Sequence, residues 1–245
     1  MALSTRRPAA VVSTSGTAAI NHGPALAEAY FSGIPLLSVT ADRSVESRPT
    51  GPGQYVCQTD LFAAHTVLSI EVDEATQDAP FIEQQALAAW KAVARGPVHV
   101  NIPFEEPLYG KVEANSPSLI IPPYDDHGAP MPEGLRDVLS CHDPRILIHI
   151  GPLQESELDA DVVCALEERF GLIVDTFACA QSEAESSTMR WMCGWDETCS
   201  EVLAPQVIVT AGLPPMDKTF RAQLSRSNVP HYHIGVEVHA WNVFG

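Results

Sequence analysis

Two groups of residues near the N-terminus are of types that bind polar or anionic ligands. The first group, Ser15, Gly16 and Thr17, directly follows an apolar segment, and the second is Arg43 at the end of another. Gly16 allows a tight turn, so the hydroxyl and backbone N–H groups beside it can face a polar ligand. The guanidinium of Arg43 stays charged at physiological pH and can bind a carboxylate through two parallel hydrogen bonds. Both groups are therefore candidate binding residues.

Each group also has an ordinary structural interpretation, which the residues alone leave open. A Ser or Thr ahead of a helix is often only its N-cap, and an arginine exposed on the surface contributes nothing measurable. An irregular loop after Arg43 leads to Gln54 and Gln58, whose amides can offer donors and acceptors to a ligand. Such a loop either carries functional residues or is simply mobile.

The elements that position these residues are predicted to alternate between strands and helices. The predicted strands are residues 9–13, 35–40, 67–72 and 98–102. The predicted helices are residues 17–31 and 76–93. This order indicates parallel strands in a buried sheet. Open sheets of this kind bind ligands at the carboxyl ends of their strands, which is where Ser15 and Arg43 lie.

A proline-rich segment divides the chain into two predicted domains. We place the first domain at residues 1–112, the linker at 113–133 and the second domain at 134–245, because periodicity is lost where the prolines are concentrated. The second domain is predicted to be Rossmann-like. Its predicted strands and helices are 145–150, 155–170, 172–177, 206–210, 216–224 and 231–234. The predicted fold class is α/β, with two parallel-sheet, three-layer domains, each incomplete because neither end looks like a finished domain edge.

Composition excludes several classes of function. The chain has 14 Lys and Arg against 31 Asp and Glu, a net charge of −17, which repels nucleic acids and anionic lipids. No run of apolar residues is long enough to span a membrane, so we expect a cytoplasmic protein. The six cysteines form no CxxC pair and indicate neither a disulfide framework nor a zinc site. His231 and His233 alternate along one strand, but no third metal ligand is suitably spaced, and we predict no metal site.

Four motifs in the first 110 residues follow the order and spacing of a known family. They are STSGTA at 13–18, LLSVTADR at 36–43, GQ at 53–54 with Gln58 and LFA at 61–63, and GPVHVNIPFEEPLY at 96–109. In these motifs the chain resembles the 2-succinyl-5-enolpyruvyl-6-hydroxy-3-cyclohexene-1-carboxylate synthases, which are thiamine-diphosphate-dependent carboligases of menaquinone biosynthesis. Beyond these motifs the resemblance is weak and is chiefly to the middle domain of the family.

The resemblance implies an activity and a set of site residues. The family uses thiamine diphosphate and Mg²⁺ to decarboxylate 2-oxoglutarate and to add the succinic semialdehyde unit to isochorismate. By this resemblance the turn of Ser15, Gly16 and Thr17 lines the pyrimidine half of the cofactor, and Arg43 and Gln54 hold substrate carboxylates. The first domain is then the C-terminal part of a pyrimidine-binding domain. Active sites shared between subunits imply a homodimer or a homotetramer.

The chain also departs from the family pattern. Gly53 stands where the family often has Asn, and Cys57 where it often has Arg, so each position lacks side-chain donors. The family's activating Glu and its Ser-Arg substrate motif lie upstream of the motifs found here, and no Gly-Asp-Gly signature for binding the diphosphate through Mg²⁺ occurs in the sequence. We therefore predict no catalytic residue and no metal ligand in this chain, and expect the chain as given to be inactive by itself.

Two other hypotheses remain open. One is another carboligase, of the acetolactate-synthase type, although that family typically carries Gly-Pro-Gly at the turn around Gly16. The other is a non-catalytic α/β module that binds an anionic metabolite or a partner chain through Arg43.

Overall fold

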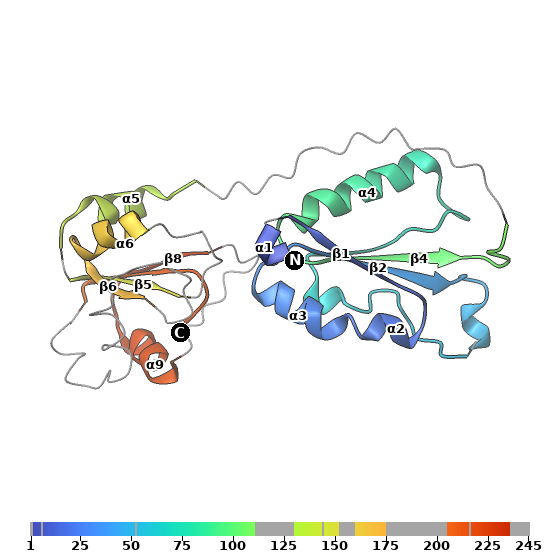
Figure 1. Cartoon of the computed structure of the whole chain (residues 1–245), viewed down its shortest axis with the longest axis horizontal. Coiled ribbons are helices and arrows are strands. Elements are labelled where there is room, and N and C mark those ends of the chain that lie inside the picture. The colour runs from blue at the N-terminus through green and yellow to red at the C-terminus, as the bar shows by residue number, and fades with distance from the viewer. Residues whose placement is uncertain are drawn as a thin grey trace. The chain divides into compact units, whose positions relative to one another are not determined.

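The computed structural model forms two compact units, residues 1–127 and 128–245, which are described separately. The structure describes residues 2–5, 7–51, 53–110, 130–143, 145–151, 160–174, 205–215 and 217–235. Each unit holds a sheet of parallel strands with helices on both faces (Figure 1). The predicted α/β class is thereby confirmed. Most of the predicted linker, 113–133, lies outside the described residues.

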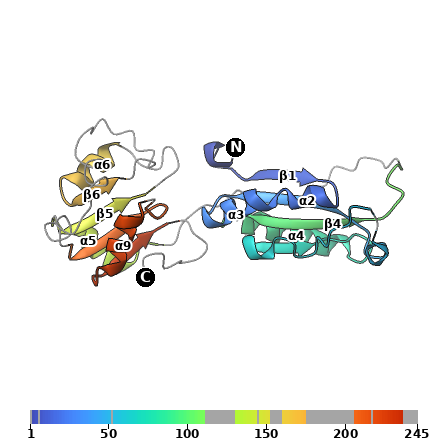
Figure 2. The same ribbon diagram turned by 90° about the horizontal axis from the view of Figure 1, so that it is seen from below.

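The sheet of the first unit has the strand order β1-β2-β4-β3. Its strands are β1 (Ala9–Ser13), β2 (Leu36–Arg43), β3 (Leu68–Glu71) and β4 (Val98–Phe104). Its helices are α1 (Ala2–Thr5), α2 (Thr17–Ile20), α3 (Gly23–Phe31) and α4 (Ala79–Val93). Helices α2 and α3 cover one face of the sheet and α4 the other, as Figures 1 and 2 show from two directions. All four predicted strands are present, and the two central ones are longer than predicted.

The predicted helix at 17–31 is in fact two helices. Helix α2 ends at Ile20, and α3 begins at Gly23 after a turn. Pro24, in the first turn of α3, has no N–H to donate to Ile20, so it cannot continue a helix but is well suited to begin one. The prediction of one continuous helix is therefore wrong. Helix α4 likewise begins later than predicted, because the Asp78 side chain caps it by accepting a hydrogen bond from the backbone N–H of Phe81 at 3.0 Å.

The two faces of the first sheet differ in chemistry. The face toward α4 is apolar, with Ala89 and Val93 of the helix packed near Val98 of the sheet. The opposite face carries polar side chains at its carboxyl edge, in one row across four strands. The row consists of Ser13, Thr40, Asn101 and Glu71, which are in register. The polar residues are therefore gathered beside the turn that follows β1.

The sheet of the second unit has the strand order β6-β5-β7-β8. Its strands are β5 (Ile146–Ile150), β6 (Gly171–Val174), β7 (Val207–Ala211) and β8 (His231–Ile234). Its helices are α5 (Glu133–Ser140), α6 (Ala160–Glu167) and α9 (Lys218–Arg226). The predicted second-domain elements are present where the structure describes them. The helix predicted at 155–170 and the strand predicted at 172–177 lie partly outside the described residues.

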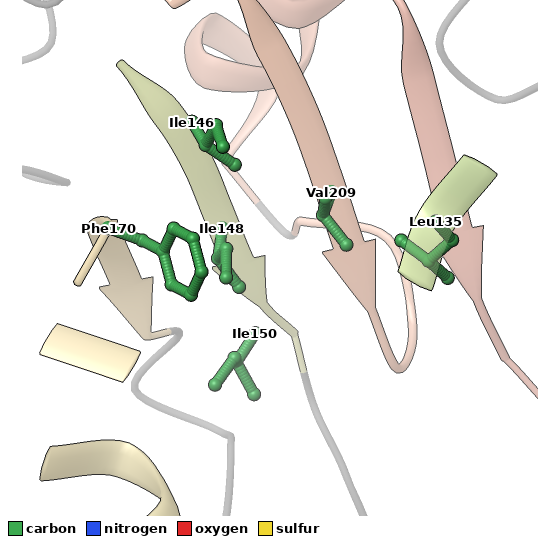
Figure 3. Packing of buried hydrophobic residues seen from close by; sticks show 6 residues of the cluster. All are labelled: Leu135, Ile146, Ile148, Ile150, Phe170 and Val209. Carbon is green, nitrogen blue, oxygen red and sulfur yellow. The ribbon is translucent and has the colours of Figure 1, made fainter. Parts of the chain in front are cut away.

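Helix α5, which the sequence did not predict, packs on the core of the second unit. Leu135 of α5 is buried in one hydrophobic cluster with Val209, Phe170 and isoleucines of β5 (Figure 3). The isoleucines are Ile146, Ile148 and Ile150. Every residue of β5 is buried, as expected for a central strand of a parallel sheet with helices on both faces. Among the described residues, no helix is long and apolar enough to cross a membrane.

Candidate functional site

The turn after β1 is built around Gly16. Its backbone has φ 86° and ψ −142°, a combination that L residues rarely adopt. A Cβ at this position would lie 2.5 Å from the carbonyl oxygen of Gln54, which is too close for any side chain. Gly16 therefore lets the turn contact the loop of Gln54, which lies 38 residues further along the sequence. Gly16 is also the N-cap of α2, and no side chain caps this helix, so Ser15 and Thr17 are not explained as capping residues.

A buried amide holds the turn in place. The Gly16 N–H donates to Oε1 of Gln58 at 2.6 Å, so this N–H binds the protein itself. Gln58 is 1% exposed, and its Nε2 donates to the carbonyl of Ala41 at 2.9 Å and to Oδ1 of Asn101 at 3.0 Å. Both the oxygen and the nitrogen of the Gln58 side-chain amide are thus hydrogen-bonded within the protein. Of the predicted cofactor residues, Ser15 is half-buried and Thr17 is exposed.

Asn101 connects this amide to two carboxylates. Its Nδ2 donates to Oδ2 of Asp42 at 2.9 Å and to Oε2 of Glu71 at 2.8 Å. Its Oδ1 accepts from Gln58 and from the hydroxyl of Thr40, at 2.8 Å from the latter. Buried polar groups are stable only when they are hydrogen-bonded in this way. The part of the row formed by Thr40, Asn101 and Glu71 is therefore a hydrogen-bonded network rather than an open site.

Arg48 neutralises the two carboxylates. Its Nη2 lies 2.9 Å from Oδ2 of Asp42, and its two terminal nitrogens bind the two oxygens of Glu71 at 3.3 and 3.1 Å. The Asp42 side chain is 1% exposed, compared with 26% for that of Glu71. Burial by itself would raise the pKa of Glu71, but hydrogen bonds from Arg48, Asn101 and Thr59 together outweigh burial and lower that pKa. Both carboxylates are accordingly held as hydrogen-bond acceptors.

Arg43, the predicted substrate anchor, takes no part in this ion pair. Its backbone N–H donates to Oδ1 of Asp42 at 2.7 Å, and its carbonyl accepts from Nε of Arg48 at 3.2 Å. Successive side chains on a strand point to opposite faces, so that of Arg43 leaves the sheet away from Asp42. Arg43 is half-buried, and within the described part of the chain its guanidinium forms no salt bridge. It remains a cation that a ligand can use.

Gln54, the second predicted substrate residue, lies at the turn. It is exposed and has φ 61°, in the left-handed region that is unusual for a residue other than glycine. Its carbonyl is the group that contacts Gly16. Among the described residues, no hydrogen bond joins Gln54 to Arg43. The structure thus brings Gln54 to the predicted cofactor residues, whereas the prediction that Gln54 and Arg43 share one cavity stays a prediction.

Two buried histidines lie deeper on the polar face. Nε2 of His99 lies 2.8 Å from the Thr40 hydroxyl, and its ring lies edge-on to Phe62 at 5.0 Å. Nδ1 of His22 lies 2.9 Å from the Ser38 hydroxyl. Burial, followed by the nearby charge of His22, lowers the pKa of His99 to about 4, so His99 is neutral at physiological pH. Because it is neutral and enclosed, His99 is a core residue rather than a ligand-binding group.

The other groups considered in the sequence do not form sites in the described residues. His231 and His233 both lie within 2.9 Å of the Thr210 hydroxyl, and no cluster of three or more potential metal ligands occurs in the part of the chain that the structure describes. A cavity of about 320 Å³ lies between α4 and the sheet. Its lining is entirely apolar and on the face opposite to the polar row, so it does not suit an anionic ligand.

The sequence missed Arg48 and Asn101 as parts of this arrangement. Arg48 stands in an irregular loop where no periodicity indicates its direction. Asn101 lies inside an apolar strand. A polar residue in a buried strand must form hydrogen bonds, so its presence indicates a polar network even in the sequence. Gln58 is a possible ligand-binding amide by sequence, but the structure shows it buried against Gly16.

The fold and the turn agree with what comparison with known proteins shows. Residues 1–65 match the family described as thiamine pyrophosphate enzyme, N-terminal TPP binding domain. The first unit is therefore similar to the N-terminal domain of the thiamine pyrophosphate enzymes. The match includes the turn at Gly16 and the loop with Gln54 and Gln58.

The more specific resemblance is to one kind of synthase. The chain is 30% identical to the 2-succinyl-5-enolpyruvyl-6-hydroxy-3-cyclohexene-1-carboxylate synthase of Flavobacterium johnsoniae. The aligned region covers 96% of the chain and 44% of that relative. It is 31% identical to the synthase of the same name from Geobacillus kaustophilus, and the aligned region covers 92% of the chain and 42% of that relative. The corresponding synthase of Halorhodospira halophila is 37% identical over 69% of the chain and 31% of the relative. The resemblance inferred from the motifs is thereby confirmed, and the chain spans less than half the length of these relatives.

Proposed function

We propose that the first unit binds the pyrimidine half of thiamine diphosphate at the turn of Ser15, Gly16 and Thr17. The observation that carries the proposal is the contact of Gly16 with Gln54 and Gln58, which brings two separate segments of the matched region together at the carboxyl edge of the sheet. The residues fit a polar ring. The Ser13 hydroxyl at the end of β1 is buried and has no hydrogen-bond partner among the described residues.

The whole protein is proposed to be a thiamine-diphosphate-dependent carboligase that uses 2-oxoglutarate and isochorismate. When bound, the cofactor stabilises negative charge on the carbon that loses carbon dioxide, and the protein orients the reactants. Both substrates are polyanions, whereas the chain has a net charge of −17 and a field that repels them. A local cation is therefore needed, and the guanidinium of Arg43, which forms no salt bridge with any described residue, supplies one.

Further parts of the proposal concern the metal and the assembly. Mg²⁺ would accompany the diphosphate, but no metal-ligand cluster is present in the described residues, so we assign it no ligand there.

A homodimer or homotetramer would place this unit beside another subunit. Sedimentation equilibrium of the protein checks this point, and a monomer over the whole accessible concentration range would contradict it.

Calorimetric titration with thiamine diphosphate tests the proposed function. We expect the chain to bind the cofactor, and the Gly16→Ala variant to lose binding because the added Cβ displaces Gln54. Gly110→Ala is the matched control, since nothing lies within 4 Å of a Cβ at that position. Equal affinity of the Gly16→Ala variant and the unmodified chain would contradict the assignment of the turn. Loss of 2-oxoglutarate binding in Arg43→Met, with thiamine binding retained, would support the role of Arg43.

A further inference from the structure

The orientations of two buried amides decide which atom faces Gly16. Asn101 directs its NH₂ group at the carboxylates of Asp42 and Glu71, so its oxygen must face the other way, toward Gln58. Gln58 then donates through Nε2, which leaves its oxygen to accept from the Gly16 N–H. An amide has one donor end and one acceptor end, so reversing either would bring like groups together. The two carboxylates therefore determine that Gly16 meets an acceptor.

A single cation, Arg48, pairs with both carboxylates. Asp42 and Glu71 both accept from the single Nδ2 of Asn101, so their oxygens are close and repel each other. Arg48 binds both, at 2.9 and 3.1 Å. Without this cation, repulsion would favour protonation of one carboxyl group, and a protonated carboxyl is a donor as well as an acceptor. Asn101 would then be able to turn its oxygen toward the carboxyl group.

Arg48 also connects this network to the loop that carries Gln54. Its Nη1 donates to the Thr59 hydroxyl at 3.1 Å, and the same hydroxyl donates to Glu71 at 3.0 Å. Thr59 directly follows Gln58, so the loop is attached at two adjacent residues, one to the acidic pair and one to Gly16. The loop position therefore depends on Arg48.

We propose that Arg48 is a positioning residue for the ligand-binding turn. It acts through its ion pairs with Asp42 and Glu71, which balance the charge of the two carboxylates so that the amides of Asn101 and Gln58 keep their orientations. The inference rests on the proposed function, because the turn matters to the reaction only if it meets the cofactor. The structural part of the inference is nevertheless measurable without any ligand.

Hydrogen exchange of the Gly16 amide in the ¹⁵N-labelled chain tests the proposal. In Arg48→Met we expect Gly16 to exchange about tenfold faster relative to reference amides, which corresponds to the loss of about one hydrogen bond. The reference amides are Val39 and Val100 in the central strands. A merely structural role would accelerate exchange of Gly16 and of the reference amides equally, and that result, or unchanged exchange at Gly16, would overturn the proposal.

A double variant separates charge balance from general damage. Adding Glu71→Gln to Arg48→Met removes the repulsion between the carboxylates, so the protection of Gly16 should recover toward that of the unmodified chain. Protection in the double variant that is no higher than in the single variant would count against the proposal. If the single variant does not fold, a double variant that also fails to protect Gly16 would count against it equally. Arg145→Met is the matched control, because Arg145 forms an exposed ion pair with Asp143 in the other unit.

The two hypotheses fail in different ways. If the chain does not bind thiamine diphosphate in the calorimeter but Gly16 loses protection in Arg48→Met, the proposed function fails and the positioning role stands. If the chain binds the cofactor and Gly16 is unaffected by the substitution, the positioning role fails and the proposed function stands.

Discussion

Arg48 forms an ion pair with Asp42 at 2.9 Å, whereas Arg43, which directly follows Asp42 in the sequence, donates to Asp42 only through its backbone N–H. The cause is the alternation of side chains along β2, which places Asp42 on the polar face of the sheet and Arg43 on the other. The chain turns back between β2 and Arg48, where the backbone N–H groups of Ser47 and Arg48 both donate to the carbonyl of Ser44, at 3.0 and 3.3 Å. Arg48 thus holds the two carboxylates, whereas the Arg43 guanidinium forms no salt bridge within the described part of the chain.

Replacement of Glu71 by Gln is expected to flatten the acid dependence of stability of the first unit. The folded-state pKa of Glu71 is lowered, so the unfolded chain binds a proton more readily, and the contribution of Glu71 to stability is lost as the pH falls below its ordinary value of 4.5. Urea unfolding between pH 6 and pH 3, followed by the amide signals of β2, measures the slope. Glu83→Gln, at an exposed position on α4, is the control. An equally steep slope in the Glu71 and Glu83 variants would contradict this account.

Much of the fold follows from the sequence, because parallel sheets have a strong signature. Apolar segments alternating with helical periodicity locate every strand of the first sheet within a few residues. Helix α5 has a weak sequence signature, because it follows a proline-rich segment and contributes one buried residue, Leu135. The break before Pro24 is visible in the sequence, but the apolar pattern continues across it, and pattern alone therefore favours one helix.

The site is less predictable than the fold. Gly16 and Gln54 are identified by their motifs, but their contact depends on the left-handed backbone of Gln54, which no pattern indicates. The network through Asn101 depends on pairing of strands that are far apart in the sequence. Register places Asn101 beside Glu71, and only the structure shows which side chains converge there.

Gly16→Ala is expected to destabilise the first unit as well as to weaken cofactor binding. Alanine at φ 86° is strained by about 1–3 kcal/mol, and its Cβ would also collide with the Gln54 carbonyl. The midpoint of urea unfolding, read from the amide signals of β1 and β2, measures the loss. Gly53→Ala provides a comparison in the facing loop, where a Cβ would meet nothing within 4 Å and should leave the midpoint unchanged.

Leu135→Ala is expected to cost the second unit about 3 kcal/mol, because it leaves a cavity under α5 where Leu135 packs against Val209. Val162→Ala, at a site that is 48% exposed on α6, should have little effect. Unfolding followed by the amide signals of β5 compares the two variants. Similar losses in both would show that α5 does not cover the core.

His99→Phe is expected to remove a second acid-sensitive component of stability, in a pH range above that of Glu71. The pKa of His99 falls from an ordinary 6.5 to about 4 in the folded state, so the unfolded chain gains a proton first as the pH is lowered. Between these values the stability of the first unit should decline by up to about 1.4 kcal/mol per pH unit for one proton.

Phenylalanine keeps the ring that packs against Phe62 but cannot bind a proton, and the Thr40 hydroxyl retains Asn101 as its acceptor. The decline between pH 6.5 and pH 4 should therefore be smaller in His99→Phe than in the unmodified chain. His142→Phe, at an exposed histidine of the other unit, controls for the change of residue type. A decline that is identical in all three proteins would mean that His99 titrates alike in the folded and unfolded chain, and would contradict its enclosure on the polar face of the sheet.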